Sequence, residues 1–194
     1  AISFSMLSFT TSISASERKI NMNQHWKFYH GCIANAEQPS FNDSGWRVLD
    51  IPHDWSVEPL PVQREGITIG PFSRMSIGGP DTGQTVGGEG WYRKELILQP
   101  GDTDKILSLY FEGAYNQTEV WINGQKACFN AYGYIPFRID INKYCNAPGI
   151  PNTIAVKVIN EGLNSRWYAG SGIYRHVWLI KTDKVHLDEW DTFV

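Results

Sequence analysis

The sequence predicts an all-β protein, an antiparallel jelly-roll β-sandwich. Short segments with alternating apolar residues recur at a spacing of about ten residues and are separated by turn signals. No stretch shows the long 3.6-residue apolar period of an amphipathic helix. The 18 glycines and 10 prolines among 194 residues suit a chain with many turns. A chain of this length can bury a substantial core without a metal or a disulfide.

The first predicted strands are marked by aromatic residues and by the turns that end them. Trp26–Tyr29 opens the domain with three aromatic residues in four positions. Trp91–Leu98 alternates imperfectly and stops at Gln99–Asp102, a proline- and glycine-containing turn signal. Ile106–Glu112 follows and places Leu107, Leu109 and Phe111 on one face, as expected for a strand that covers a core.

A hairpin and two further strands complete the pattern. Glu119–Ile122 runs into Asn123-Gly124, the commonest two-residue hairpin turn, and returns through Gln125–Phe129. The remaining predicted strands are Asn152–Asn160 and His176–Lys181, and a further segment is expected to begin within Val185–Val194.

Two long loops carry the candidate site residues. The segment between Trp55 and Gly90 is rich in proline and glycine, and a segment of this length without strands is usually functional or disordered. Its carboxylates Asp81 and Glu89 could accept hydrogen bonds from sugar hydroxyls, or the segment could be a solvated flexible loop.

The second loop, Asn164–Arg175, separates the last two predicted strands. Arg166, Trp167 and Tyr168 project large hydrogen-bonding side chains from it. Flat aromatic rings stack on the apolar faces of sugars, and arginine forks onto hydroxyls or carboxylates. The alternative is that this cluster pins the loop against a neighbouring domain.

The remaining composition excludes several classes of function. Three cysteines without Cys-x-x-Cys spacing (Cys32, Cys128 and Cys145) and five scattered histidines predict no metal site and at most one disulfide. We also expect no cofactor. A formal net charge of -3 gives no electrostatic case for binding nucleic acid.

The first sixteen residues differ from the rest of the chain. They carry no charge and end in Ser14-Ala15-Ser16, small residues typical of a signal-peptide cleavage site. The run is too short and too rich in serine to span a membrane. We therefore expect residues 1–16 to be the remnant of a signal peptide, and the protein to be exported to the periplasm, the cell surface or the medium. The alternative is a disordered leader.

Six motifs occur in order along the chain: Ile51–Trp55, Gly87–Lys94, Phe111–Gly113, Val120–Gly124, Gly133–Phe137 and Ser165–Arg175. Together they resemble the amino-terminal sugar-binding domain of glycoside hydrolase family 2, in particular the β-galactosidase-like members from Bacteroides-type bacteria. The resemblance covers nearly all of the chain beyond the leader.

The resemblance implies a galactose-binding-domain-like jelly roll over residues 17–187, with residues 188–194 beginning a linker to an immunoglobulin-like domain. A (β/α)8 barrel should follow and carry the two glutamates of a retaining exo-glycosidase. These 194 residues contain no such barrel, so no catalytic residue and no hydrolysis by the fragment alone are expected. The implied partners are a terminal β-linked sugar and the downstream domains of the same polypeptide.

Two candidate substrate contacts depart from the family pattern. The resemblance places Arg166 where β-galactosidases and β-glucuronidases have a sugar-contacting aspartate, and Gly87 where a β-galactosidase has a substrate-contacting asparagine. These departures argue against plain lactose-type specificity. Arg166 could favour a charged or sulfated glycan or could support its loop, and we favour support.

The other motif residues are expected to be structural. The residues interpreted as core are Trp26, Trp46, Trp55, Trp91 and Trp121. His53-Asp54-Trp55 is interpreted as a hydrogen-bonded turn, since no nucleophile accompanies it. Two other classes of function stay open beside the glycosidase domain: a stand-alone carbohydrate-binding module and a structural β-sandwich without a ligand.

Overall fold

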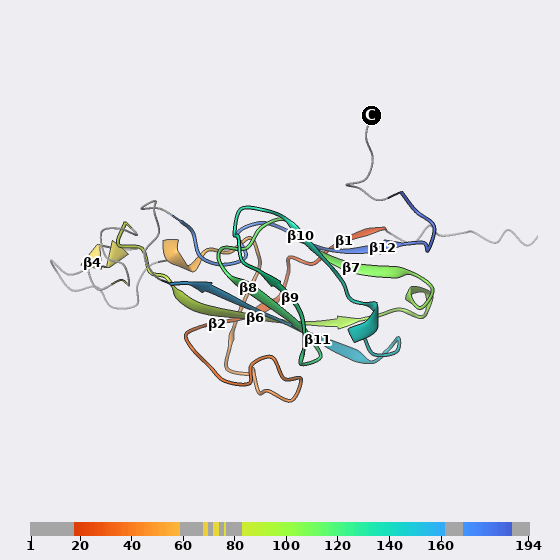
Figure 1. Cartoon of the computed structure of the whole chain (residues 1–194). Coiled ribbons are helices and arrows are strands. Elements are labelled where there is room, and N and C mark those ends of the chain that lie inside the picture. Colours follow the sequence, from red (N-terminus) through yellow and green to blue (C-terminus); the bar gives the residue numbers. More distant parts are fainter. Residues whose placement is uncertain are drawn as a thin grey trace, which may run out of the picture.

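The protein is an antiparallel β-sandwich (Figure 1), seen in a computed structural model that describes residues 18–58, 68–69, 72–73, 76, 83–161 and 169–187. One sheet has four strands in the order β1-β12-β7-β10, and the other has six in the order β3-β2-β6-β11-β8-β9. All pairings within the two sheets are antiparallel. The predicted fold class is therefore confirmed.

The strands of the four-stranded sheet are β1 (Lys19–Asn21), β12 (Val177–Thr182), β7 (Ile106–Phe111) and β10 (Phe137–Asp140). Those of the six-stranded sheet are β3 (Arg47–Leu49), β2 (Trp26–His30), β6 (Gly88–Ile97), β11 (Pro151–Asn160), β8 (Thr118–Ile122) and β9 (Gln125–Asn130). A separate pair consists of β4 (Thr68–Ile69) and β5 (Phe72–Ser73). The described helices are single 3-10 turns: η1 (Trp55–Val57), η3 (Pro100–Asp102) and η4 (Asn142–Tyr144).

The core lies between the two sheets and is built by the alternation seen in the sequence. Leu107, Leu109 and Phe111 of β7 face Ile154, Val156 and Val158 of β11 from the opposite sheet, and all six are fully buried. The ring of Phe111 stacks on that of Phe137, with centroids 4.8 Å apart and planes 4° apart. This interior makes the four- and six-stranded sheets one folding unit.

The hairpin prediction at Asn123-Gly124 is confirmed. Both residues have positive φ, 52° and 79°, as a tight turn between twisted strands requires. The Asn123 side chain also donates to the Tyr144 carbonyl oxygen at 2.9 Å and to Asn152 Oδ1 at 2.8 Å. The turn is thereby fastened to the neighbouring loop as well as to its own strands.

Three strands of the sandwich were not predicted: β1, β3 and β10. Each has three or four residues and lies at the edge of its sheet. Such short edge strands offer too few residues for alternation to show. Strand β6 also begins earlier than predicted, at Gly88 instead of Trp91. The segment expected from Val185 onward forms no strand in its described part, which ends at Leu187.

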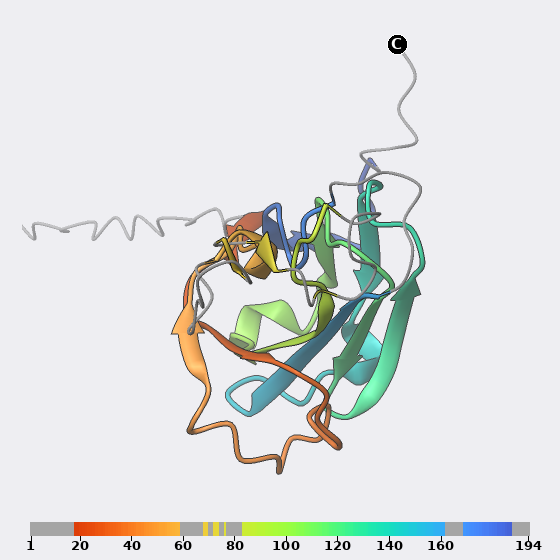
Figure 2. The ribbon, with the colours of Figure 1, turned by 90° about the vertical axis from the view of Figure 1, so that its left-hand side faces the viewer.

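Three of the five tryptophans assigned to the core are buried: Trp26, Trp55 and Trp91. Trp91 packs on the outer face of the six-stranded sheet in a smaller cluster with Ala36 and Ala155, and there it stacks on the half-buried Trp121 at 5.4 Å. Figure 2 looks onto the end of the sandwich that carries η1 and shows the loop between β2 and β3, in orange, crossing beside this outer face. That loop adds Phe41 and the half-buried Trp46 to the cluster.

Candidate functional site

The candidate site lies at the end of the sandwich that carries η1. Loops from four parts of the chain meet there: residues 51–58 after β3, 113–117 between β7 and β8, 131–136 between β9 and β10, and 169–174 before β12. The sequence-predicted residues Arg166, Trp167, Tyr168 and Asp81 lie outside the described residues. The positions of Glu89 and Gly87 are described.

Residues 169–174 are held between two other loops by backbone hydrogen bonds. On one side, the amides of His53 and Trp55 donate to the carbonyl oxygens of Ile173 (2.8 Å) and Ser171 (3.0 Å). On the other side, Tyr115 and Gly172 exchange two hydrogen bonds of 2.9 Å. The segment that follows Arg166–Tyr168 is therefore fixed like a short extra strand.

Glycine is required at position 172 of this segment. Its φ is +129°, where other residues are strained, and a Cβ there would lie 2.6 Å from the His53 carbonyl oxygen and would collide with the Tyr92 hydroxyl. The motif Ser171-Gly172 thus permits the close approach of the two loops.

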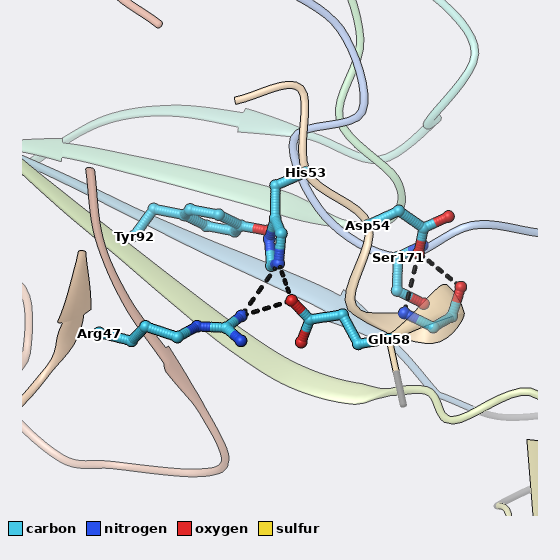
Figure 3. A network of polar contacts seen from close by, with 7 residues as sticks. Arg47, His53, Asp54, Glu58, Tyr92 and Ser171 are labelled. Atoms are coloured by element: carbon cyan, nitrogen blue, oxygen red, sulfur yellow. Dashed lines mark hydrogen bonds and ion pairs between the residues drawn. The ribbon is translucent and has the colours of Figure 1, made fainter. Parts of the chain in front are cut away.

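Asp54 joins the two loops through one carboxylate oxygen. Its Oδ1 accepts hydrogen bonds from the Ser56 amide at 2.9 Å and from the Ser171 amide at 2.8 Å, and also from the Ser56 hydroxyl (Figure 3). The first contact caps η1, and the second crosses 117 residues of sequence. The Asp54 carboxylate therefore anchors the 169–174 loop at its centre.

A second polar group surrounds His53 (Figure 3). His53 Nδ1 lies 2.7 Å from the Tyr92 hydroxyl, and Nε2 lies 2.9 Å from Glu58 Oε1. The Arg47 guanidinium donates to the same Glu58 oxygen at 2.6 Å. Every one of these side chains has a partner within the group, and the described residues bring no serine or cysteine nucleophile to His53. The interpretation of His53-Asp54-Trp55 as a hydrogen-bonded turn is confirmed.

Burial sets the protonation states in this group. Burial lowers the pKa of His53, and the Glu58 carboxylate offsets only part of that effect. Burial by itself raises the pKa of Glu58, but hydrogen bonds from Arg47 and His53 outweigh it and hold that pKa below its usual value. Burial also raises the pKa of Tyr92 well above its usual value. The resting group therefore holds a neutral histidine, a charged carboxylate and a neutral phenol near pH 7.

Gly87 borders the 51–58 loop, whereas Glu89 lies apart from the loops around Asp54. The Gly87 carbonyl oxygen accepts from Trp55 Nε1 at 3.1 Å, and a Cβ at Gly87 would collide with the backbone oxygen of Asn160. Glu89 Oε1 accepts from Trp91 Nε1 at 2.6 Å, on the outer face of the six-stranded sheet. Gly87 can therefore offer backbone only, and the Glu89 carboxylate is already engaged by an indole.

A pocket of about 230 Å³ opens between the loops, which we call the tyrosine pocket. It is lined by Asp54, Tyr115, Tyr134, Gly170 and Tyr174. The Tyr115 and Tyr134 rings lie 5.1 Å apart, and the Tyr174 hydroxyl donates to the Gly133 carbonyl oxygen at 2.8 Å. Sequence reasoning missed this site, although three of its residues lie within or beside the motifs Gly133–Phe137 and Ser165–Arg175.

A larger hollow of about 450 Å³ lies elsewhere, on the outer side of the six-stranded sheet, with Lys27, Asp43 and Arg93 among its lining. There Asp43 bridges Lys27 at 2.5 Å and Arg93 at 2.8 Å. These three charged side chains of the hollow therefore satisfy one another.

The described part of the chain offers no set of three His, Cys, Asp or Glu side chains placed to hold a metal ion. Its three cysteines are unpaired. Within the same residues, no helix has the length and apolar character needed to cross a membrane.

Comparison with known proteins decides the family. The model of the sugar-binding domain of glycosyl hydrolases family 2 matches residues 47–183. The chain belongs to this family. The glycoside hydrolase family 2 domain is 41% identical, over 95% of its length, to the β-galactosidase BoGH2A of Bacteroides ovatus. It is 30% identical, over 92% of its length, to a β-glucuronidase of Formosa agariphila.

The same relationship holds among solved structures. A glycosyl hydrolase family 2 member from Bacteroides cellulosilyticus superposes with a TM-score of 0.82 at 40% identity, covering 90% of this domain and 22% of that chain. The domain spans only 20% of BoGH2A and 18% of the Formosa protein. The resemblance to the family's amino-terminal sugar-binding domain is thus confirmed, and the chain corresponds to about a fifth of its relatives.

Proposed function

We propose that this chain is the amino-terminal, pocket-shaping domain of an exported exo-glycosidase that hydrolyses terminal β-galactosides with retention. The observation that carries the proposal is the 41% identity with a β-galactosidase over 95% of this chain but only 20% of the relative. The catalytic glutamates would lie on a (β/α)8 barrel in another part of the polypeptide, roughly 5–5.5 Å apart.

In this proposal the domain's own carboxylates position loops. Asp54 anchors the loop of residues 169–174, and Glu58 is held by Arg47 and His53. The loop so anchored continues directly from Arg166, Trp167 and Tyr168, the proposed contacts to the sugar. Asp81 is proposed as a further contact, and Gly87 would leave room at the rim. Glu89 is not proposed as a contact, because its carboxylate accepts a hydrogen bond from Trp91 on the outer face of the six-stranded sheet.

A β-glucuronidase activity is the second candidate, because relatives of this chain include a β-glucuronidase of Formosa agariphila at 30% identity. In that case the Arg166 guanidinium would pair with the sugar carboxylate through charge-assisted hydrogen bonds. Arg166→Ala would then cost more with an acidic sugar than with a neutral galactoside.

The test uses the full-length polypeptide that contains this chain. We expect it to hydrolyse 4-nitrophenyl β-galactopyranoside faster than the β-glucuronide, with the β-anomer of galactose as the first product by NMR. Faster cleavage of the glucuronide would establish the second candidate. An absence of cleavage of either glycoside would refute the glycosidase proposal, and an open reading frame ending near Val194 would indicate a stand-alone module.

A substitution tests the role of the loop within that enzyme. Trp167→Ala should lower kcat/KM by roughly ten- to hundredfold through lost stacking and packing. Phe129→Ala removes a ring that is 54% exposed on β9 and serves as the matched control. A well-folded Trp167→Ala enzyme with unchanged kcat/KM would show that the loop is scaffold only.

Export rests on the uncharged residues 1–16 with their terminal Ser-Ala-Ser. Fractionation of cells that express the full gene should recover the enzyme outside the cytoplasm, with a mature amino terminus near Glu17. An unprocessed enzyme in the cytoplasm would contradict this part of the proposal.

A further inference from the structure

We propose that the tyrosine pocket is a subsite for a neutral pyranose ring on the leaving-group side of the scissile bond. This assignment rests on the proposed function and adds the substrate class that the pocket receives. The catalytic barrel would hold the terminal sugar, and this domain would hold the sugar that follows it.

Aromatic rings from three different loops form the walls. Tyr115 follows β7, Tyr134 precedes β10 and Tyr174 precedes β12. Tyr132 extends the aromatic surface, with its ring centroid 5.6 Å from that of Tyr134. Aromatic rings with a polar tip suit a pyranose, which has an apolar face of C–H groups and a polar rim of hydroxyls.

The phenol groups of Tyr115 and Tyr174 are held neutral at neutral pH. Burial raises the pKa of Tyr115, and the neighbouring Tyr134 raises it further. Burial likewise raises the pKa of Tyr174. Neutral hydroxyls can both donate to and accept from a sugar, which a phenolate cannot do.

Asp54 supplies the one carboxylate of the lining. Its described hydrogen bonds all end on Oδ1, which ties together the loops around it. Its Oδ2 lies against Gly170 so closely that a Cβ at that position would collide with it. Glycine at 170 therefore leaves room for this oxygen, and Asp54 lines the pocket, where its carboxylate is placed to accept hydrogen bonds from sugar hydroxyls. A carboxylate there disfavours an acidic ring, so the preferred ligand is neutral.

The walls of the tyrosine pocket are preformed, because contacts inside the protein hold them in place. A Cβ at Gly133 would collide with the Tyr115 ring, so that glycine allows the loop before β10 to rest on the ring. The Tyr174 hydroxyl then fixes the same loop through the Gly133 carbonyl oxygen. Tyr115 itself is buried and paired with Gly172. A preformed aromatic wall binds a ring with little loss of conformational entropy.

Size and exposure point to the leaving-group sugar. At about 230 Å³ the pocket is smaller than the roughly 300–1,000 Å³ of drug-sized ligand sites, so it matches a single ring. Tyr134 is 55% exposed and Tyr132 is 57% exposed, so the pocket is shallow and open. An exo-enzyme encloses the terminal sugar, whereas the following sugar must continue outward into the rest of the glycan. An open aromatic pocket fits the second requirement.

The first experiment measures binding and does not depend on hydrolysis. Methyl β-glucopyranoside, a model of the leaving sugar of lactose, is titrated by NMR into the full-length polypeptide. We expect Tyr134→Ala to raise Kd about tenfold, by analogy with other aromatic stacking, and Phe129→Ala, a ring of equal exposure on β9, to leave Kd unchanged. Methyl β-glucuronide should bind more weakly than the glucoside to the parent protein.

The second experiment measures turnover of two galactosides. β-Galactosyl fluoride has no ring in its leaving group, whereas lactose has one. Tyr134→Ala should lower the ratio of kcat/KM for lactose to kcat/KM for the fluoride about tenfold, and Phe129→Ala should not change this ratio. Tyr134→Phe keeps the ring and should recover most of the ratio.

The outcomes separate this inference from the proposed function. If the full-length protein cleaves no glycoside, the proposed function fails, and the NMR titration still decides whether the pocket binds a pyranose. If it cleaves glycosides but Tyr134→Ala changes neither Kd nor the ratio, the subsite is refuted. A large fall in the melting temperature of Tyr134→Ala with unchanged sugar binding would assign the tyrosines to an interdomain contact and would also overturn the inference.

Discussion

Asp54→Ala should destabilise this domain more than its partial exposure suggests. One oxygen of Asp54 serves as acceptor for the amides of Ser56 and Ser171, which belong to different loops. Removal of an N-cap carboxylate costs about 1 kcal/mol. Ser171 is fully buried, so its amide would lose its acceptor where water cannot replace it, which costs about 1–3 kcal/mol more. We therefore expect a total loss of about 2–4 kcal/mol.

The assay is urea unfolding followed by tryptophan fluorescence, with the buried Trp26 and Trp55 as reporters. Asp54→Asn keeps an oxygen at the same place, and because neutral hydrogen bonds are about half as strong as charge-assisted ones, it should lose no more than about half as much. Asp104→Ala, at an exposed carboxylate between η3 and β7, is the control and should stay within about 0.5 kcal/mol. If Asp54→Ala cost no more than Asp104→Ala, the reasoning that Asp54 anchors two loops would be refuted.

Three further predictions concern stability. Burial depresses the folded-state pKa of His53 below 6.5. The stability that His53 contributes is therefore complete above about pH 6.5 and is lost as the pH falls through the folded pKa. The unfolding free energy of the wild type should decline in that range, and the decline should be smaller in His53→Gln. Phe111→Ala removes a fully buried ring stacked on Phe137 and should cost about 3–5 kcal/mol in urea unfolding, whereas Val185→Ala, at a residue that is 93% exposed, should cost less than about 0.5 kcal/mol. Gly172→Ala forces a Cβ into the Tyr92 hydroxyl and the His53 backbone, whereas Gly101→Ala has open space around the new methyl group. The melting temperature of Gly172→Ala should therefore fall well below that of Gly101→Ala. Equal melting temperatures would contradict the close loop packing.

Much of the fold could be read from local patterns. The strands with strong alternation, β7 and β11, were found because a half-buried strand repeats its environment every second residue. The Asn123-Gly124 turn was found because both positions need positive φ. Strands β1, β3 and β10 were missed because edge strands of three or four residues show too little of the same signal.

The site was harder to predict than the sheets. The aromatic side chains expected to bind sugar were chosen from one loop, Arg166–Tyr168, because they are adjacent in the sequence. The tyrosine pocket instead combines positions 54, 115, 134, 170 and 174, which no sequence spacing links. Likewise, Glu89 looked available in the sequence, yet its carboxylate accepts the hydrogen bond of the Trp91 indole.

The sequence by itself determined the fold class, the long strands, the hairpin and the family, because alternation, turn chemistry and ordered motifs are properties of neighbouring residues. Only the tertiary structure decided that one oxygen of Asp54 holds two loops together and that Asp54 lines the same pocket as three tyrosines. That arrangement depends on how the sheets bring their loops to one end, and on glycines that let backbones approach. Contacts made over 117 residues of sequence, such as that between Asp54 and Ser171, follow from packing and not from any local preference of the chain.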